Sequence, residues 1–173
     1  MNARARLQNL SRDQLIDLIE VYSKNWLAMD GVWFQSVEEA YGMDEAMRHD
    51  ARAWKQFTVI EAKRIKDFLN LPEQSGLAGL QQALEYRFYA NINRDEITIE
   101  GNTLTYRVLS CRVQNVRARK QMELHPCKSV GIIEYSGFAS TIDDRIVCEC
   151  LSCYPEVRDE HCNCAWKFTL TEN

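Results

Sequence analysis

The sequence predicts an α+β domain in which N-terminal helices pack on an antiparallel sheet of about four strands, arranged as two hairpins separated by helices. Residues 11–90 carry apolar side chains at helical spacing, whereas residues 96–108 and 145–170 alternate apolar and polar side chains with a period of two. No linker or repeat divides the chain, so we expect one domain over residues 1–173. Its helical half covers about 11–90 and its sheet-containing half about 95–171.

Four helices are expected in the helical half. Ser11 has the side chain of an N-cap, and apolar residues follow it at helical spacing up to Met29. Asp30-Gly31 is expected to end this helix, and Gly42 to end a short second one. A long helix is predicted over about 43–70, stopped before Pro72, and a fourth over about 77–90.

Two hairpins are expected in the sheet-containing half. Gly101-Asn102 is a two-residue turn that places Ile99 opposite Leu104 and Ile97 opposite Tyr106, so both apolar pairs share a face. Helical stretches follow near 115–123 and 130–141, and the last strands lie near 145–151 and 162–170. These strands are predicted to fold back on each other about Glu156.

The composition excludes several classes of protein. The formal net charge is -4, which argues against a nucleic-acid partner, and the basic run Arg112, Arg117, Arg119, Lys120 is interpreted as a solvated helix face. No apolar run approaches the roughly 20 residues of a membrane span, and the start has no apolar signal region. We therefore expect a cytoplasmic protein with no membrane partner, whose thiols stay reduced, and which could form a homodimer.

Two carboxylates interrupt the apolar face of the long helix. At helical spacing, Asp50 and Glu61 fall among its apolar residues. Each could cap a neighbouring helix or pair with an arginine, or both could line a polar pocket with Asp30 at its edge. Three helical turns separate them by about 16 Å, so they cannot act as one carboxylate pair. The expected pocket lies between the helical half and the sheet, with aromatic walls at Trp26, Trp33, Trp54 and Trp166.

Five of the seven cysteines lie in the segment CECLSCYPEVRDEHCNC, residues 148–164. The period-two pattern directs the sulfurs in its strands to the apolar side. A hairpin centred on Glu156 would place three pairs opposite each other: Cys150 and Cys162, Cys148 and Cys164, Ile146 and Trp166. Opposed residues are close enough for two sulfurs to share a metal.

These cysteines form a candidate structural zinc site, because Cys150-x-x-Cys153 at a strand end can wrap a zinc ion. An outside ligand could come from His125-Pro126-Cys127 or from His161. The predicted zinc ligands are Cys127, Cys150, Cys153, Cys162 and Cys164. The alternative is that the thiols are small apolar core residues.

Cys127 has a separate interpretation as a nucleophile. It precedes a helix that Ser129 is expected to cap, and the positive end of a helix favours a thiolate. His125 is two residues away and could act as the base. The alternative is a half-buried cysteine or a metal ligand.

Several segments resemble an uncharacterised family of bacterial and archaeal cytosolic proteins over about residues 11–170. They are KNWLAMDGVWF, EAKRI, CRVQNVRARK, PCKSVGIIEYSGFASTID and CAWKFTL. That family is similar to L-2-amino-thiazoline-4-carboxylic acid hydrolase-like proteins. The resemblance implies cysteines at the positions of Cys127, Cys150, Cys153 and Cys164, whereas Cys148 and Cys162 are additional here.

The order of helices and hairpins is also similar to vinyl-reductase-type ligand-binding domains and to subunits of Golgi trafficking complexes. That similarity implies a small or acyl-like ligand between the helices and the sheet. Two functions follow as expectations: a cytosolic small-molecule-binding protein with a zinc-holding cysteine cluster, or a thiol-dependent hydrolase of a small cyclic or amide substrate, using Cys127 and His125.

Overall fold

The computed structural model describes residues 2–172 and confirms the α+β class. The helical half contains α1 (Ala3–Gln8), α2 (Arg12–Tyr41), α3 (Met43–Leu69), α4 (Gly76–Glu85) and a 3-10 turn, η1 (Phe88–Asn91). The other half contains β1 (Arg94–Glu100), β2 (Thr103–Ser110), α5 (Arg112–Arg119), α6 (Lys128–Ile142), β3 (Ile146–Cys153) and β4 (Cys164–Leu170).

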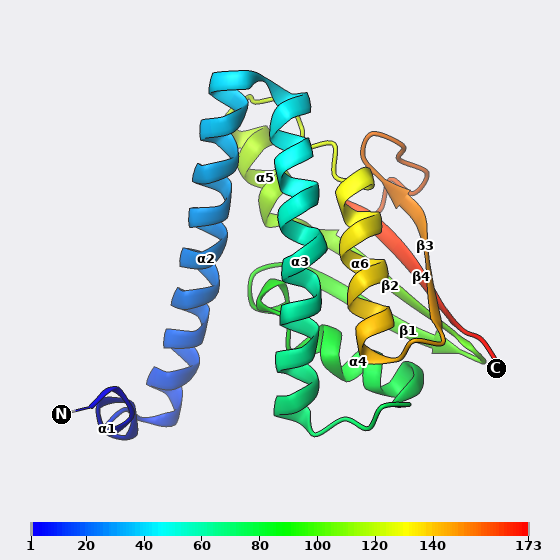
Figure 1. Cartoon of the computed structure of the whole chain (residues 1–173). Coiled ribbons are helices and arrows are strands. Elements are labelled where there is room, and N and C mark those ends of the chain that lie inside the picture. Colours follow the sequence, from blue (N-terminus) through cyan, green and yellow to red (C-terminus); the bar gives the residue numbers. More distant parts are fainter. Residues whose placement is uncertain (1, 173) are drawn as a thin grey trace.

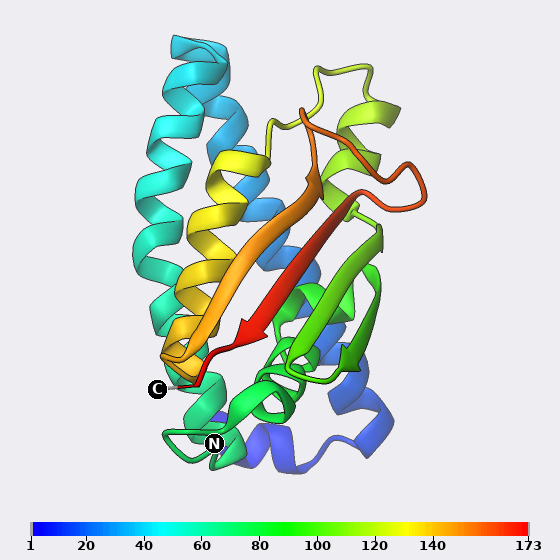
Figure 2. The same cartoon turned by 90° about the vertical axis from the view of Figure 1, so that its right-hand side faces the viewer.

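The elements are stacked in layers (Figures 1 and 2). The four strands form one antiparallel sheet in the order β1-β2-β4-β3. Helix α6 packs against both β3 and α3, and α2 lies beyond α3. The main core lies between the sheet and α6, with Phe138 and Phe168 fully buried in it. No helix within residues 2–172 is long and apolar enough to cross a membrane.

Helix α2 is longer than the sequence predicted, because it continues through Asp30-Gly31 to Tyr41. The prediction of a helix end at Gly31 was wrong: a glycine inside a helix costs only about 1 kcal/mol, which the continuing apolar spacing outweighs. Gly42, with φ of 88°, does separate α2 from α3. The fourth helix ends at Glu85, and only a 3-10 turn occupies the last part of the predicted range.

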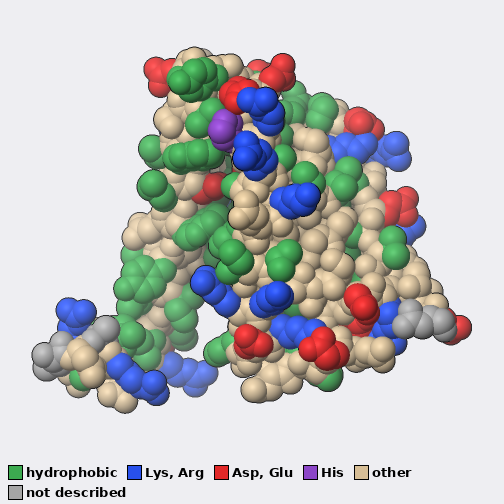
Figure 3. All heavy atoms as spheres, in the orientation of Figure 1, with side chains coloured by type: hydrophobic (Ala, Val, Ile, Leu, Met, Phe, Trp, Pro, Cys, Tyr) green, Lys and Arg blue, Asp and Glu red, His purple; other side chains and the backbone are tan. Residues whose placement is uncertain are grey.

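Helix α2 exposes much of its apolar surface (Figure 3). The side chains of α2 that are buried are Ser23, Leu27 and Phe34, all in its central and C-terminal parts. Its exposed large apolar residues are Ile16, Ile19, Val21, Tyr22, Met29, Val32, Trp33 and Tyr41.

The first hairpin has the predicted register, with Ile97 opposite Tyr106 and Ile99 opposite Leu104. Gly101 has φ of 59°, which suits the turn that glycine was expected to make.

The second hairpin has a different register from the predicted one. Ile146 lies opposite Leu170, Cys148 opposite Phe168, and Cys150 opposite Trp166. The predicted pairs Cys150–Cys162, Cys148–Cys164 and Ile146–Trp166 are therefore wrong, and Cys162 lies in the loop before β4.

Side-chain contacts explain the longer loop. Ser152 Oγ accepts hydrogen bonds from the backbone N–H groups of Arg158 and Asp159. Asn163 joins the far end of the loop to β2, because its N–H donates to Val108 O and its Oδ1 accepts from Cys111 N–H. These contacts stabilise a wide loop between β3 and β4. The alternation of apolar and polar residues alone had predicted a tighter loop.

A β-bulge in β3, between Cys150 and Ser152, changes which side chains face inward. Residues three apart on a regular strand point to opposite faces. The extra residue restores the alternation, so Cys150 lies opposite Trp166 and Cys153 lies opposite Cys164. Both cysteines of the C-x-x-C motif therefore face the core side of the sheet.

Candidate functional site

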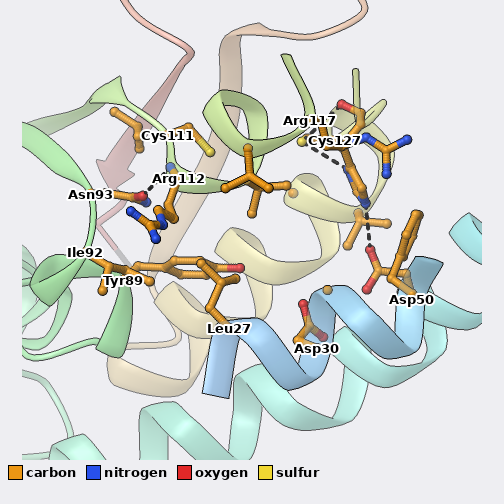
Figure 4. A pocket seen from close by; sticks show the side chains of 18 of the residues that line it. Leu27, Asp30, Asp50, Tyr89, Ile92, Asn93, Cys111, Arg112, Arg117 and Cys127 are labelled. Carbon is orange, nitrogen blue, oxygen red and sulfur yellow. Dashed lines mark hydrogen bonds and ion pairs between the residues drawn. The ribbon is translucent and has the colours of Figure 1, made fainter. Parts of the chain in front are cut away.

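A cavity of about 390 Å³ opens between α2, α5, η1 and the core face of the sheet (Figure 4). The cavity lining includes Asp30, Asp50, Trp54 and Trp166, four of the seven predicted pocket residues.

The other three predicted pocket residues lie outside this lining. Trp26 packs among aromatic rings, with centroids 4.9 Å from Phe57 and 4.2 Å from Phe88. Trp33 is 42% exposed. Glu61 is buried and pairs with Arg87, which is the arginine-pairing alternative that the sequence left open.

A chain of three side chains lies in the wall of the cavity. Nδ1 of His125 is 3.1 Å from Sγ of Cys127, and its Nε2 is 3.4 Å from Oδ2 of Asp50. The side chains of His125 and Asp50 are only 11% and 8% exposed, and the ring of Phe34 packs on the imidazole. A thiol, an imidazole and a carboxylate in this order form the arrangement in which a base activates a nucleophile and a third group orients the base.

Three separate elements bring these groups together. Asp50 projects from α3, and its carboxylate contacts the ring of His125, which lies in the loop before α6. A dashed line marks this contact at the labelled Asp50 in Figure 4. Cys127 is the N-cap of α6, which has no side-chain capping hydrogen bond. The sequence predicted the pairing of Cys127 with His125, and it placed Asp50 facing inward, but it did not predict their contact.

Gln114 of α5 is a site residue that the sequence reasoning missed. Its Nε2 donates to His125 O at 2.8 Å and to Cys127 Sγ at 3.2 Å, while its Oε1 accepts from His125 N–H at 3.1 Å. Gln114 therefore fixes the backbone of His125 and supplies a donor to the sulfur.

Arg117 corrects the interpretation of the basic run as a solvated face. It is 3% exposed, and its two terminal nitrogens donate to both carboxylate oxygens of Glu38 at 2.8 and 2.6 Å. This bidentate ion pair joins α5 to α2. Arg112, Arg119 and Lys120 of the same run are exposed at the cavity wall.

Other thiols lie close to Cys127. Hydrogen bonding with the Cys127 thiol raises the pKa of Cys153, and a bond to Cys153 raises the pKa of Cys164 well above its usual value. Cys111 lines the cavity elsewhere, and burial raises its pKa to about 11. These three thiols stay protonated at neutral pH.

The predicted zinc ligands are only partly brought together. Cys127, Cys153 and Cys164 line the cavity, whereas Cys150 and Cys162 do not. In the described part of the chain, no group of three or more His, Cys, Asp or Glu side chains is arranged to hold a metal ion. His161 is exposed in the loop before β4. The zinc site therefore stays a prediction.

Two carboxylates, Asp30 and Glu134, line the part of the cavity that we call its inner end. Both have pKa values above the usual range of a carboxyl group. Burial raises the pKa of Asp30 to about 6, helped by the charge of Asp50. Burial also raises the pKa of Glu134 to about 7, although Arg87 opposes that shift. The cavity wall thus combines a thiol-imidazole pair with carboxylates that can exchange protons near neutral pH.

Comparison with known protein families places the chain. The model of a family of unknown function, DUF6125, matches residues 8–170. The chain belongs to this family. A search of curated proteins gave no match for the DUF6125 chain. Its relation to the thiazoline hydrolase-like proteins therefore rests on the resemblance alone.

Proposed function

We propose that this DUF6125 protein binds a small organic molecule in the cavity and hydrolyses it with Cys127 as nucleophile. The observation that carries this proposal is the chain from Asp50 through His125 to Cys127 in the cavity wall.

The reaction follows from the positions of the groups. His125 takes the thiol proton, and the Cys127 thiolate attacks the carbonyl carbon of an amide or ester, which forms a C–S bond and an oxyanion. The oxyanion would be stabilised by Gln114 Nε2 and by N–H groups at the start of α6. The leaving group then takes the proton from His125 as its bond to carbon breaks.

Water completes the cycle. His125 removes a proton from water, and the hydroxide attacks the thioester carbon. The C–S bond then breaks to release the acid, and His125 returns the proton to the sulfur, which restores the thiol. Asp50 is a positioning residue here, because it touches only the imidazole and holds one ring orientation.

Selective alkylation tests this proposal. The wild-type protein is treated with iodoacetamide at about pH 6, where only an activated thiol reacts quickly, and each cysteine is followed by peptide mass spectrometry. We expect Cys127 to be labelled first, and His125→Gln to slow that labelling. Cys111→Ser, which removes a cavity thiol remote from His125, is the matched control and should leave Cys127 labelling unchanged. Equal labelling of Cys127 and the other thiols would overturn the proposal.

We also propose the zinc site as a competing second candidate, supported by the adjacent thiols of Cys127, Cys153 and Cys164. A sulfur bound to zinc would not be free to attack a substrate, so the two candidates exclude each other at Cys127. Elemental analysis of freshly purified protein decides between them. Less than about one tenth of a zinc ion per chain would exclude the metal site.

The seven unpaired cysteines support a reducing compartment, and we propose the cytoplasm on that basis.

A further inference from the structure

The inner end of the cavity has more negative than positive charge. Arg87, which is 2% exposed, binds two carboxylates: its Nη2 is 2.8 Å from Glu61 Oε2 and 2.7 Å from Glu134 Oε1. One guanidinium facing two carboxylates leaves a net charge of about -1 when both are ionised. Asp30 adds another negative charge when it is ionised, and no hydrogen bond or ion pair with another described residue neutralises that charge.

Glu134 presents an unused acceptor to this space. The residue is 8% exposed and lines the cavity, and Arg87 contacts its Oε1 only. Its Oε2 has no hydrogen-bond or ion-pair partner among the described residues. Oε2 is not among the fully buried polar atoms, so it can be reached from the cavity. An accessible carboxylate oxygen in a largely buried side chain favours a ligand that brings a hydrogen-bond donor with it.

Aromatic rings complete the surroundings of these carboxylates. Tyr89 points into the cavity from η1, and Asp30 points toward the same space from α2 (Figure 4). Trp54 and Tyr135 also line it. Aromatic faces attract cations, and Arg87 already lies within 5.9 Å of the Trp54, Tyr89 and Tyr135 rings.

We infer that the inner end of the cavity binds the protonated amino group of a small organic cation, with Asp30 and Glu134 as its acceptors. This inference rests on the proposed function only where it concerns the substrate. Cys127 and Glu134 lie seven residues apart on α6, which is two turns or about 10 Å on one face. A substrate attacked by Cys127 would therefore carry its ammonium group about that far from the reacting carbon.

The outer wall of the cavity limits the charge of this ligand. The exposed side chains of Arg112, Arg119 and Lys120 would repel a second positive group there. The chemistry favours a monocation whose outer end is neutral or anionic.

Binding of simple probes tests this inference. Hexylamine, hexan-1-ol and hexanoate have similar length and differ in charge, and calorimetry at about pH 8 keeps both carboxylates ionised. We expect hexylamine to bind at least about tenfold more tightly than hexan-1-ol, and hexanoate to bind weakest. Asp30→Asn and Glu134→Gln should each reduce that preference while hexan-1-ol binding stays unchanged. Glu39→Gln, on the exposed face of α2, is the matched control.

The outcomes separate this inference from the proposed function. Cys127→Ser should retain the preference for hexylamine, because Cys127 takes no part in amine binding. The inference would be overturned if the wild-type protein bound hexylamine and hexan-1-ol with equal affinity. It would also be overturned if the preference for hexylamine survived both carboxylate substitutions. Either result would count even if Cys127 is rapidly alkylated. Slow alkylation of Cys127 together with selective amine binding would overturn the hydrolase and leave the cation site standing.

Discussion

Only some of the groups around the sulfur of Cys127 come from residues near it in the sequence. His125 comes from the same loop, Gln114 from α5, and Asp50 reaches the imidazole from α3. The nucleophile role therefore depends on tertiary packing of elements that are up to about 77 residues apart in the chain, not on a local motif.

Asp50→Asn should slow alkylation of Cys127 by about tenfold to a hundredfold, because an amide stabilises the charged imidazole less than a carboxylate does. The rate is measured across a pH series, since a purely structural role would lower the fold stability without changing the shape of that profile. Asp44→Asn, an exposed carboxylate in the first turn of α3, is the control. An unchanged profile for Asp50→Asn would remove Asp50 from the site.

Gly131→Ala should destabilise the protein by about 1–3 kcal/mol, because a Cβ there would lie 2.6 Å from the ring of buried Trp166. Urea unfolding measures the change. Gly31→Ala is a matched helical control: its Cβ meets only Gln35 at 3.8 Å, so we expect about 0.5–1 kcal/mol of stabilisation. Equal effects at both positions would contradict the close contact.

Among single residues, the sequence predicted those site residues that a local sequence pattern marks. Cys127 and His125 are two apart, and Asp50 stood out as a carboxylate on an apolar helix face. The roles of Gln114, Arg87 and Glu134 could not be predicted, because their partners are distant in the chain and ordinary polar residues carry no periodic signal.

At the scale of elements, α5 is held in place mainly by polar contacts. Its buried residues are Gln114 and Arg117, one bonded to the His125 loop and the other to Glu38 of α2. A short helix held by such contacts opens more easily than one packed in a core, and α5 covers one side of the cavity.

Glu38→Gln should loosen α5, since Arg117 would lose the charge of its bidentate partner while remaining buried. We expect faster amide exchange over residues 112–119 and a loss of about 1–3 kcal/mol in the free energy of unfolding. Hydrogen exchange with mass spectrometry measures the first and urea unfolding the second. Glu39→Gln is the control, and similar exchange in both variants would contradict this account of α5.

The two hairpins show what a sequence can determine about elements. The register of the first was predicted correctly, because a two-residue Gly-Asn turn leaves no freedom of register. The second was misplaced, because Ser152 and Asn163 stabilise a longer loop and a bulge interrupts the alternation. Neither of these side-chain hydrogen bonds can be predicted from the spacing of apolar residues.

For the whole molecule, the buried carboxylates predict how stability varies with pH. Burial raises the pKa of Glu134 from 4.5 to about 7, so the folded protein keeps a proton that the unfolded chain releases between those values. The free energy of unfolding should therefore fall as pH rises through that window, by at most about 1.4 kcal/mol per pH unit for this group. Asp143, whose pKa its bonds to Arg145 lower to about 2, contributes only in more acidic solution.

Glu134→Gln should flatten this slope between about pH 5 and 7, whatever its effect on absolute stability. Urea unfolding at a series of pH values measures it. Glu160→Gln, an exposed residue in the loop before β4, should leave the slope unchanged. An identical slope in wild type and Glu134→Gln would show that this carboxyl is already ionised in the folded protein.

The single extra residue in β3 also determines how the protein tolerates changes in length. Removing Leu151 would leave Cys150 and Cys153 two residues apart on a regular strand, so both would still face the core side of the sheet. A chain of the same length whose strand lacked the bulge would instead pair Ser152 with Cys164 and turn Cys153 outward, away from Cys127. The bulge, and not only the cysteines, therefore distinguishes chains that can assemble the thiol group from those that cannot.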